Sequence, residues 1–200
     1  MIELNLDYYA KPAILFSGGA DSTLLYYLAV KHLASINFTG TLDLLLVDRY
    51  NNPVDKALKL YEKIKPLVND NISNIKNIKF HDGVQGYQQL VLLMRLLKNQ
   101  YDVIFWGVNQ YPGNSTIRPR NSEYVVDFHK YESDTIIKLP FAKYNKVDII
   151  KTYIDLGIED ILNQTHTCGE NKPEPCGECF NCRERIWAYE QLGLVPNLGI

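Results

Sequence analysis

A short apolar segment, residues 12–16, leads directly into the sequence SGGADST at residues 17–23. An apolar run of this length is typical of a buried strand, and the Ser-Gly-Gly that follows it marks a turn. Residues 22–36 then place apolar side chains at helical spacing. The segment therefore predicts a buried strand, a tight turn and a helix, which together form the first unit of a parallel α/β fold.

The same alternation continues along the chain. Further strands are expected at residues 41–47, 75–80, 103–106 and 136–139. Helices are expected at residues 53–64, 86–98, 146–155 and 183–192, with Asn145 as the N-cap of the third of these. Strands that alternate with helices pair in parallel, and such sheets bind ligands at the carboxyl ends of their strands. We therefore expect an α/β fold with a Rossmann-like parallel sheet and a site at its strand ends.

The glycine-containing turn has the chemistry of an anion site. Two glycines at a strand-to-helix turn let backbone N–H groups point at an anion, and the helix N-terminus adds positive partial charge. A carboxylate such as Asp21 would repel a phosphate unless a cation lay between them, and Mg²⁺ binds both kinds of oxygen. The turn therefore predicts a bound nucleotide with Mg²⁺, although a plain turn with an N-capping Asp or Ser would have the same residues. It lacks the Gly-Lys-Ser/Thr ending of a Walker A loop and the G-x-G-x-x-G pattern of dinucleotide sites.

All four cysteines of the chain lie near its end, as Cys168-x7-Cys176-x2-Cys179-x2-Cys182. Four thiolates at such short spacing predict a closed, tetrahedral Zn²⁺ site that is structural rather than catalytic. An iron–sulfur cluster would use the same residues, as would disulfides or separate buried thiols. We expect a nucleotide-binding domain over residues 1–142 and a helical C-terminal zinc-binding lobe over residues 143–200.

Composition excludes several classes of protein. With 46% hydrophobic and 22% charged residues and a net charge of −2, the chain has the balance of a globular protein without the basic excess of a general nucleic-acid binder. No apolar run approaches the roughly 18 residues needed to cross a bilayer. Residues 1–10 lack the basic region of a signal peptide. We therefore expect a cytoplasmic protein that requires neither a membrane nor a nucleic acid, and in that compartment clustered cysteines favour a metal.

With its S-G-G-x-D-S sequence after the first strand, the chain resembles the PP-loop ATP pyrophosphatases. That resemblance implies a fold of the PP-loop ATPase or adenine nucleotide alpha hydrolase type, attack on ATP at its α-phosphate, and a loop that holds the pyrophosphate. Residues 139–150, 165–168 and 175–185 are further similar to the 7-cyano-7-deazaguanine synthase (QueC) family, with its C-G-x-C-x-x-C-x-x-R pattern. Residues 81–86 and 107–114 depart from that family, and they lie where substrate should bind.

The resemblance implies an ATP-dependent carbon–nitrogen ligase. It would convert 7-carboxy-7-deazaguanine and ammonia to 7-cyano-7-deazaguanine (preQ0) through an adenylylated carboxylate, for queuosine or other 7-deazaguanine modification of nucleic acid. Sulfur-transferring relatives use a cysteine, whereas amide and nitrile formation need none, and here all four are committed to one site. A different PP-loop enzyme acting on another base, tRNA or a protein remains an alternative, as does a nucleotide-binding partner protein with a zinc interface. The partners expected are small molecules, and a homodimer is compatible with this interpretation.

The residues expected to carry catalysis are Asp21, Ser22 and Lys146. A cation in the first turn of a helix is unfavourable to the helix dipole, so the match of Lys146 to a family lysine indicates a role on ATP phosphates rather than a solvated surface. The residues expected to bind ATP and Mg²⁺ are Ser17, Gly18, Gly19, Asp21, Ser22, Thr23, Asp48 and Gly107. Substrate contacts are assigned to Tyr111, Arg118 and Arg185, each of which could instead be an ordinary packed or solvated side chain.

Overall fold

The computed structural model describes residues 2, 4, 6, 9–48, 54–79, 97, 100–112, 137–170 and 174–199. Within them, one sheet has the strand order β3-β2-β1-β4-β5. Its strands are β1 (Pro12–Leu15), β2 (Leu42–Asp48), β3 (Ser73–Lys79), β4 (Val103–Trp106) and β5 (Ile137–Lys138). Every neighbouring pair is parallel, which confirms the predicted α/β fold with a Rossmann-like sheet.

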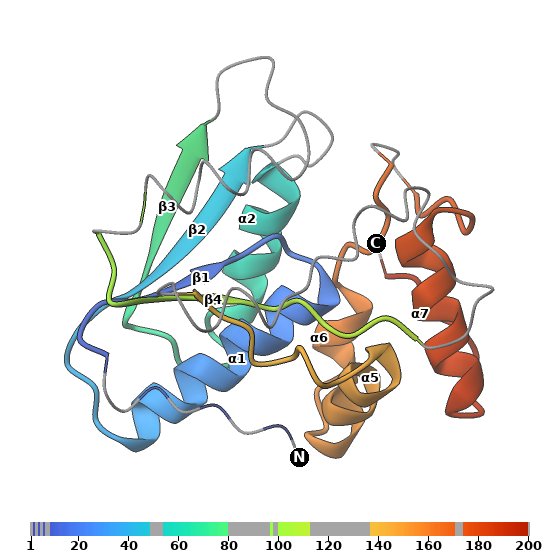
Figure 1. Ribbon diagram of the computed structural model, residues 1–200, viewed down its shortest axis with the longest axis horizontal. Coiled ribbons are helices and arrows are strands. Elements are labelled where there is room, and N and C mark those ends of the chain that lie inside the picture. The colour runs from blue at the N-terminus through green and yellow to red at the C-terminus, as the bar shows by residue number, and fades with distance from the viewer. Residues whose placement is uncertain are drawn as a thin grey trace.

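The helices of the described residues are α1 (Ala20–Ser35), α2 (Val54–Ile64), α5 (Lys146–Asp155), α6 (Glu159–Asn163) and α7 (Phe180–Gln191). Figure 1 shows α1 and α2 lying along the sheet, with α5 and α6 between α1 and α7. Because α1 contacts both β1 and α5, it is buried on most sides over its first half. The helix expected at 86–98 lies outside the described residues except for Leu97, and α6 was not expected.

Alternation along the strands divides the core between the two faces of the sheet. Ile14 and Leu44 pack into the cluster formed with α1, α2 and α5. Ala13, Leu15 and Leu45 face the other way and pack with Ile104 and other apolar side chains. The first cluster continues into α6 and α7, so buried side chains run without a break from the sheet to the C-terminal helices. The proposed boundary between residues 142 and 143 stays a prediction.

The strand order creates a switch point between β1 and β4. The chain passes from β1 outward through β2 to β3 and later returns to pair β4 with the other edge of β1. Ligands of open α/β sheets bind in the crevice at such a point, beyond the carboxyl ends of the strands. Ser17 follows β1 and Gly107 follows β4, so both lie at this crevice.

The start of α5 is fixed by a capping box. The Asn145 side chain accepts hydrogen bonds from the backbone of Val147 and Asp148, and the Asp148 carboxylate accepts one from the Asn145 backbone at 2.8 Å. These bonds satisfy N–H groups that a helix start otherwise leaves open. The predicted N-cap is confirmed, and Lys146 becomes the first residue of the helix. None of the helices in the described part of the chain is long and apolar enough to span a membrane.

Candidate functional site

A cavity of about 440 Å³ lies between the loop after β1 and the chain that leads into α7. It brings together five stretches of the chain: residues 17–21, residues 108–111, Lys146, residues 166–169 and residues 180–185. Its lining residues are Ser17, Gly19, Ala20, Asp21, Val108, Asn109, Tyr111, Lys146, His166, Thr167, Cys168, Gly169, Phe180, Asn181, Glu184 and Arg185. A second cavity of about 240 Å³ adjoins it over the ends of β1, β2 and β4. Ser17, Gly19, Asp21, Val108 and Asn109 line both cavities.

The loop after β1 is held in place by its own hydroxyls and by close packing. The Ser22 hydroxyl accepts from the Ser17 backbone at 3.2 Å and donates to the Gly19 carbonyl at 3.2 Å. Gly18 has a φ of +74° and lies so close to α2 that a Cβ there would be 3.0 Å from the Ala57 Cα. A Cβ on Gly107 would be 3.0 Å from the carbonyl of Asp21. Position 18 therefore needs glycine for its positive φ, and position 107 needs glycine because the chain after β4 passes close to the backbone of Asp21.

One ammonium and two carboxylates meet in the larger cavity. Lys146 Nζ lies 2.7 Å and 2.5 Å from the Asp21 carboxylate oxygens and 3.4 Å from Glu184 Oε2. Lys146 and Glu184 are buried, whereas Asp21 keeps 24% of its side chain exposed. Burial alone would lower the pKa of Lys146, but the two carboxylates outweigh it and raise that pKa above its usual value. Burial raises the pKa of Glu184, although Lys146 opposes the shift.

The polar residues after β4 complete the wall beside α7. Asn109 donates a hydrogen bond to Glu184 Oε1 at 3.3 Å. The Tyr111 ring meets the Phe180 ring edge to face, with centroids 5.1 Å apart. Both contacts join the segment after β4 to the first turns of α7. Tyr111, one of the expected substrate residues, thus lies at the cavity with an aromatic partner.

Arg185 is completely buried and faces the segment before the first cysteine. Its guanidinium donates to the Leu162 carbonyl at 2.8 Å, to the Thr165 hydroxyl at 2.7 Å and to the Thr167 hydroxyl. Burial lowers the pKa of Arg185. These contacts tie α7 to residues 162–167, although the residue also borders the cavity where it was expected to meet substrate.

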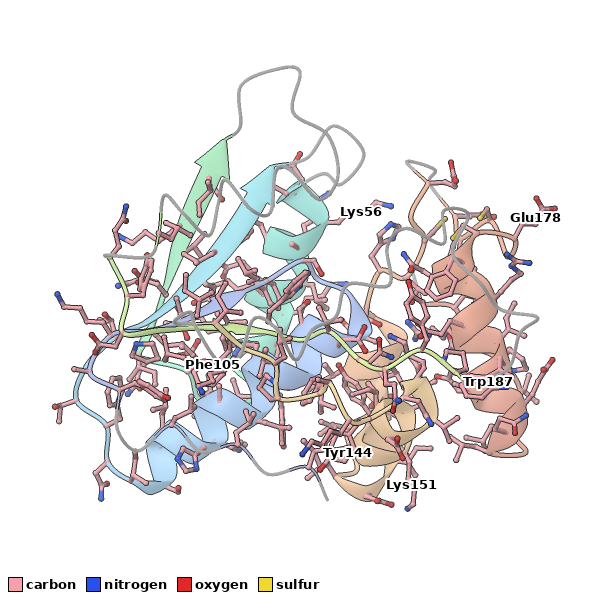
Figure 2. The ribbon with its side chains drawn as sticks, viewed as in Figure 1. Lys56, Phe105, Tyr144, Lys151, Glu178 and Trp187 are labelled. Carbon is pink, nitrogen blue, oxygen red and sulfur yellow. The ribbon has the colours of Figure 1, made fainter. Side chains whose placement is uncertain are left out.

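A second cross-connection comes from α2. The His166 backbone N–H donates to the Gly18 carbonyl at 3.0 Å, and Lys56 Nζ lies 3.4 Å from His166 Nδ1. Figure 2 shows the Lys56 side chain extending from α2 toward the C-terminal part of the chain. The glycine loop therefore contacts both α2 and the segment before Cys168.

The four cysteines lie together, as predicted from their spacing. Their Sγ atoms all lie within 4.8 Å of one another, and none is in a disulfide. Backbone N–H groups donate to the sulfurs, including Cys179 to Cys176 Sγ at 3.3 Å and Glu170 to Cys168 Sγ at 3.4 Å. Backbone N–H groups lower the pKa of the Cys176 thiol to about 6. This donor set fits a four-coordinate metal ion, since thiolates are the form that binds metals.

The remaining expected residues lie in different surroundings. Ser22 borders the smaller cavity, whereas Thr23 is completely buried in α1 and lines neither. Asp48 ends β2, but its side chain lies outside what the structure describes, as does Arg118 altogether. Glu184 was missed, because a lone glutamate between Arg183 and Arg185 in a helix looks like a solvated position. Its only sequence signal is its distance of two residues from Cys182.

Comparison with known proteins links this site to one family. Residues 97–193 match the family model described as queuosine biosynthesis protein QueC. The 7-cyano-7-deazaguanine synthase of a Nitratiruptor species is 39% identical over 64 residues, which cover 32% of this chain and 28% of the relative. The synthase of Methanospirillum hungatei is 31% identical over 102 residues, which cover 46% of this chain and 44% of the relative. The chain thus spans less than half the length of these relatives.

A solved structure also resembles the chain. It is the U34-tRNA thiolase NcsA from Methanococcus maripaludis with its 4Fe–4S cluster, at 13% identity and a TM-score of 0.48. The likeness covers 91% of this chain and 67% of that one. At this level it says nothing about what the present chain binds.

Proposed function

We propose that this chain, which matches the QueC family over residues 97–193, is an ATP-dependent ligase that converts 7-carboxy-7-deazaguanine and ammonia to 7-cyano-7-deazaguanine. The observation that carries this proposal is the cavity of about 440 Å³, which the glycine loop and α7 both line. Its lining joins the glycine loop to Asn109, Lys146 and Glu184, which all lie in the matched segment. A nucleotide on the loop and a substrate beside α7 would therefore meet in one place.

The loop side of the site suits the nucleotide. Ser17, Gly19 and the start of α1 border both cavities, so phosphates on the loop would place adenosine over the ends of β1, β2 and β4. Lys146 would neutralise charge that develops on the phosphates. Preorganised charges of this kind are the main contribution of a protein to adenylyl transfer.

Mg²⁺ fits the charges present at Asp21. Asp21 and Glu184 carry two negative charges against the single positive charge of Lys146, so the three groups leave one negative charge uncompensated. Asp21 is the more exposed of the two carboxylates and offers the oxygen ligands that Mg²⁺ prefers. We assign Asp21 as the residue that would hold Mg²⁺, which would supply positive charge beside the phosphates.

The reaction needs no protein nucleophile. A substrate carboxylate oxygen attacks the α-phosphorus of ATP, and pyrophosphate leaves. Ammonia then attacks the acyl carbon, and AMP leaves with a proton lost from nitrogen, which gives the amide. A second ATP adenylylates the amide oxygen, and AMP departs with that oxygen while nitrogen loses its remaining protons, which gives the nitrile. All four cysteines of the chain are grouped at one site, so this chemistry agrees with the residues available.

The metal at the cysteines is proposed to be Zn²⁺ with a structural role. Cys168, Cys176, Cys179 and Cys182 supply four ligands, which leaves no open position for substrate. Cys179 is the N-cap of α7 and Cys182 lies in its first turn, so the ion would fix the start of that helix. Thiolates free for metal binding suit the reducing cytoplasm, which we propose as the location.

The test is direct. The protein is incubated with ATP, Mg²⁺, ammonium and 7-carboxy-7-deazaguanine, and mass spectrometry follows the amide, the nitrile, AMP and pyrophosphate. We expect the wild type to form the nitrile and Asp21→Ala to form none. Asp155 is an exposed acid at the end of α5, so Asp155→Ala should form the nitrile as the wild type does. ATP cleavage with a different carboxylate would overturn the substrate, and nucleotide binding without any turnover would favour a non-enzymatic partner protein. Light scattering would decide between a monomer and a homodimer.

A further inference from the structure

Of the three charged groups that meet at the cavity (Asp21, Lys146 and Glu184), Glu184 is the one that lies on α7, next to the cysteines. It lies on α7 two residues after Cys182, and its side chain is only 5% exposed. A buried carboxylate is costly unless its oxygens have partners. Both oxygens of Glu184 are engaged, Oε1 by the Asn109 amide and Oε2 by the Lys146 ammonium at 3.4 Å.

The two carboxylates beside Lys146 differ in their distance from the ammonium and in their exposure. Asp21 lies closer to the ammonium and remains open to the cavity, whereas Glu184 lies farther from it and is buried. The Asn109 bond and the position on α7 hold Glu184 in place behind Lys146. Glu184 therefore competes with Asp21 for the charge of one ammonium.

We propose that Glu184 is a positioning residue that acts through Lys146: by taking part of the ammonium's charge, it keeps the Asp21 carboxylate able to bind a divalent cation with the nucleotide. Without Glu184, Lys146 pairs with Asp21 alone, and the three-group site changes from one net negative charge to none. The same residue links the cavity to the cysteines, because a metal ion held by Cys179 and Cys182 would fix the helix turn from which Glu184 projects. This inference rests on the proposed function in its use of Mg²⁺ and ATP.

The test compares Glu184→Gln with Glu190→Gln, an exposed glutamate on the same helix. Calorimetry measures binding of α,β-methylene-ATP at several Mg²⁺ concentrations and in its absence, and elemental analysis measures the metal at the cysteines. We expect Glu184→Gln to raise the half-saturating Mg²⁺ concentration at least about tenfold, because Lys146 then pairs with Asp21 alone and competes with the cation for that carboxylate. Binding of the Mg²⁺-free analogue should not weaken, and the cysteine metal content should match that of Glu190→Gln.

A double variant isolates the route through Lys146. In a Lys146→Gln background, Glu184→Gln should change the Mg²⁺ dependence by less than about twofold, because coupled residues give non-additive effects. The double variant removes both buried charges, so it remains informative if Glu184→Gln alone does not fold. Glu184→Asp, which keeps the charge on a shorter arm, should fall between wild type and Glu184→Gln.

Three results would overturn the inference. The first is an unchanged Mg²⁺ dependence in Glu184→Gln, and the second is equal weakening of binding with and without Mg²⁺, which is the mark of a merely structural residue. The third is a full effect of Glu184→Gln in the Lys146→Gln background, since Glu184 would then act on the cation by itself. A wild-type protein that binds no ATP at all would instead overturn the proposed function, and this inference with it.

Discussion

The Lys146 ammonium lies 2.7 Å and 2.5 Å from the two carboxylate oxygens of Asp21, although the residues are 125 positions apart in the sequence. The contact joins the loop after β1 to the first residue of α5. Because the capping box of Asn145 fixes the start of α5, the ammonium is held at the cavity by a rigid element. The loop and the C-terminal helices are therefore connected by charge as well as by apolar packing.

Lys146→Met should destabilise the fold by about 3–5 kcal/mol, because it leaves the Asp21 and Glu184 carboxylates without the ammonium between them. Urea unfolding followed by circular dichroism measures the change. Lys151→Met is the matched control on the same helix. Its ammonium lies 2.7 Å from Asp155, but both side chains are exposed, so the loss should be below about 1 kcal/mol. Equal losses for the two variants would show that burial does not strengthen the Lys146 contact.

Gly107→Ala should disturb the loop from the opposite side. The added Cβ would lie 3.0 Å from the Asp21 carbonyl atoms and 3.1 Å from the Ser22 nitrogen, and backbone atoms cannot move aside as a side chain can. We expect a loss of about 1–3 kcal/mol in unfolding free energy together with weaker ATP binding. Gly19→Ala is the steric control, since its Cβ meets nothing closer than 3.4 Å. Because Gly19 is the N-cap of α1 and alanine is a poorer cap, it should cost about 0.5–1 kcal/mol, less than Gly107→Ala. Wild-type stability in Gly107→Ala would mean that β4 and α1 can separate freely.

Local chemistry in the sequence was enough to predict the parts of the site that are continuous in the chain. The Ser-Gly-Gly turn follows its strand, Asn145 caps its helix, and the spacing of the cysteines brings their sulfurs together. Each of these depends on residues within one turn or one short loop. The sheet followed as well, because strand–helix alternation leaves few parallel arrangements.

Tertiary contacts decided the rest. Glu184 and Arg185 stand next to exposed Arg183 in a polar stretch of α7, and only the packing of α7 on α5 and on residues 162–167 buries them. Thr23 was expected at the nucleotide as the last residue of the Ser-Gly-Gly segment. It lies one residue beyond Ser22 in α1, and there its side chain points into the core. The five-residue helix α6 is too short to show a helical period in the sequence.

Cys182→Ser should remove the metal ion at the cysteines. Cys182 is completely buried, and a serine hydroxyl there replaces a thiolate with a much poorer ligand. We expect the metal content to fall from one ion per chain to almost none and the unfolding free energy to fall by several kcal/mol, on the order of 3. Elemental analysis of the purified wild type would identify the ion as zinc or iron.

Wild type treated with a strong chelator is the control for this loss, and its unfolding midpoint should approach that of the variant. Retention of a full equivalent of metal by Cys182→Ser would contradict a site made by all four sulfurs.

Tyr26 gives a prediction for alkaline pH. Its hydroxyl, buried in α1, donates to Asp70 Oδ2 at 2.5 Å, while Asp70 Oδ1 accepts from the Ile72 and Ser73 backbone at the start of β3. Burial and then Asp70 raise the pKa of Tyr26 far above its usual value. The folded protein thus keeps a proton that the unfolded chain releases above about pH 10, so this contribution to stability is present below that pH and declines above it.

Tyr26→Phe should therefore be less stable than wild type by about 1–3 kcal/mol at pH 7, because it leaves one Asp70 oxygen without its donor. The difference should shrink as pH rises above about 10, by up to about 1.4 kcal/mol per pH unit, because the variant has no proton to release at this position. Urea unfolding from pH 7 to pH 11 measures both values. Tyr27→Phe, one residue farther along α1 and only half-buried, should change stability by less than about 0.5 kcal/mol at pH 7. A difference between wild type and Tyr26→Phe that stays constant up to pH 11 would show that the Tyr26 hydroxyl does not keep its proton through the bond to Asp70.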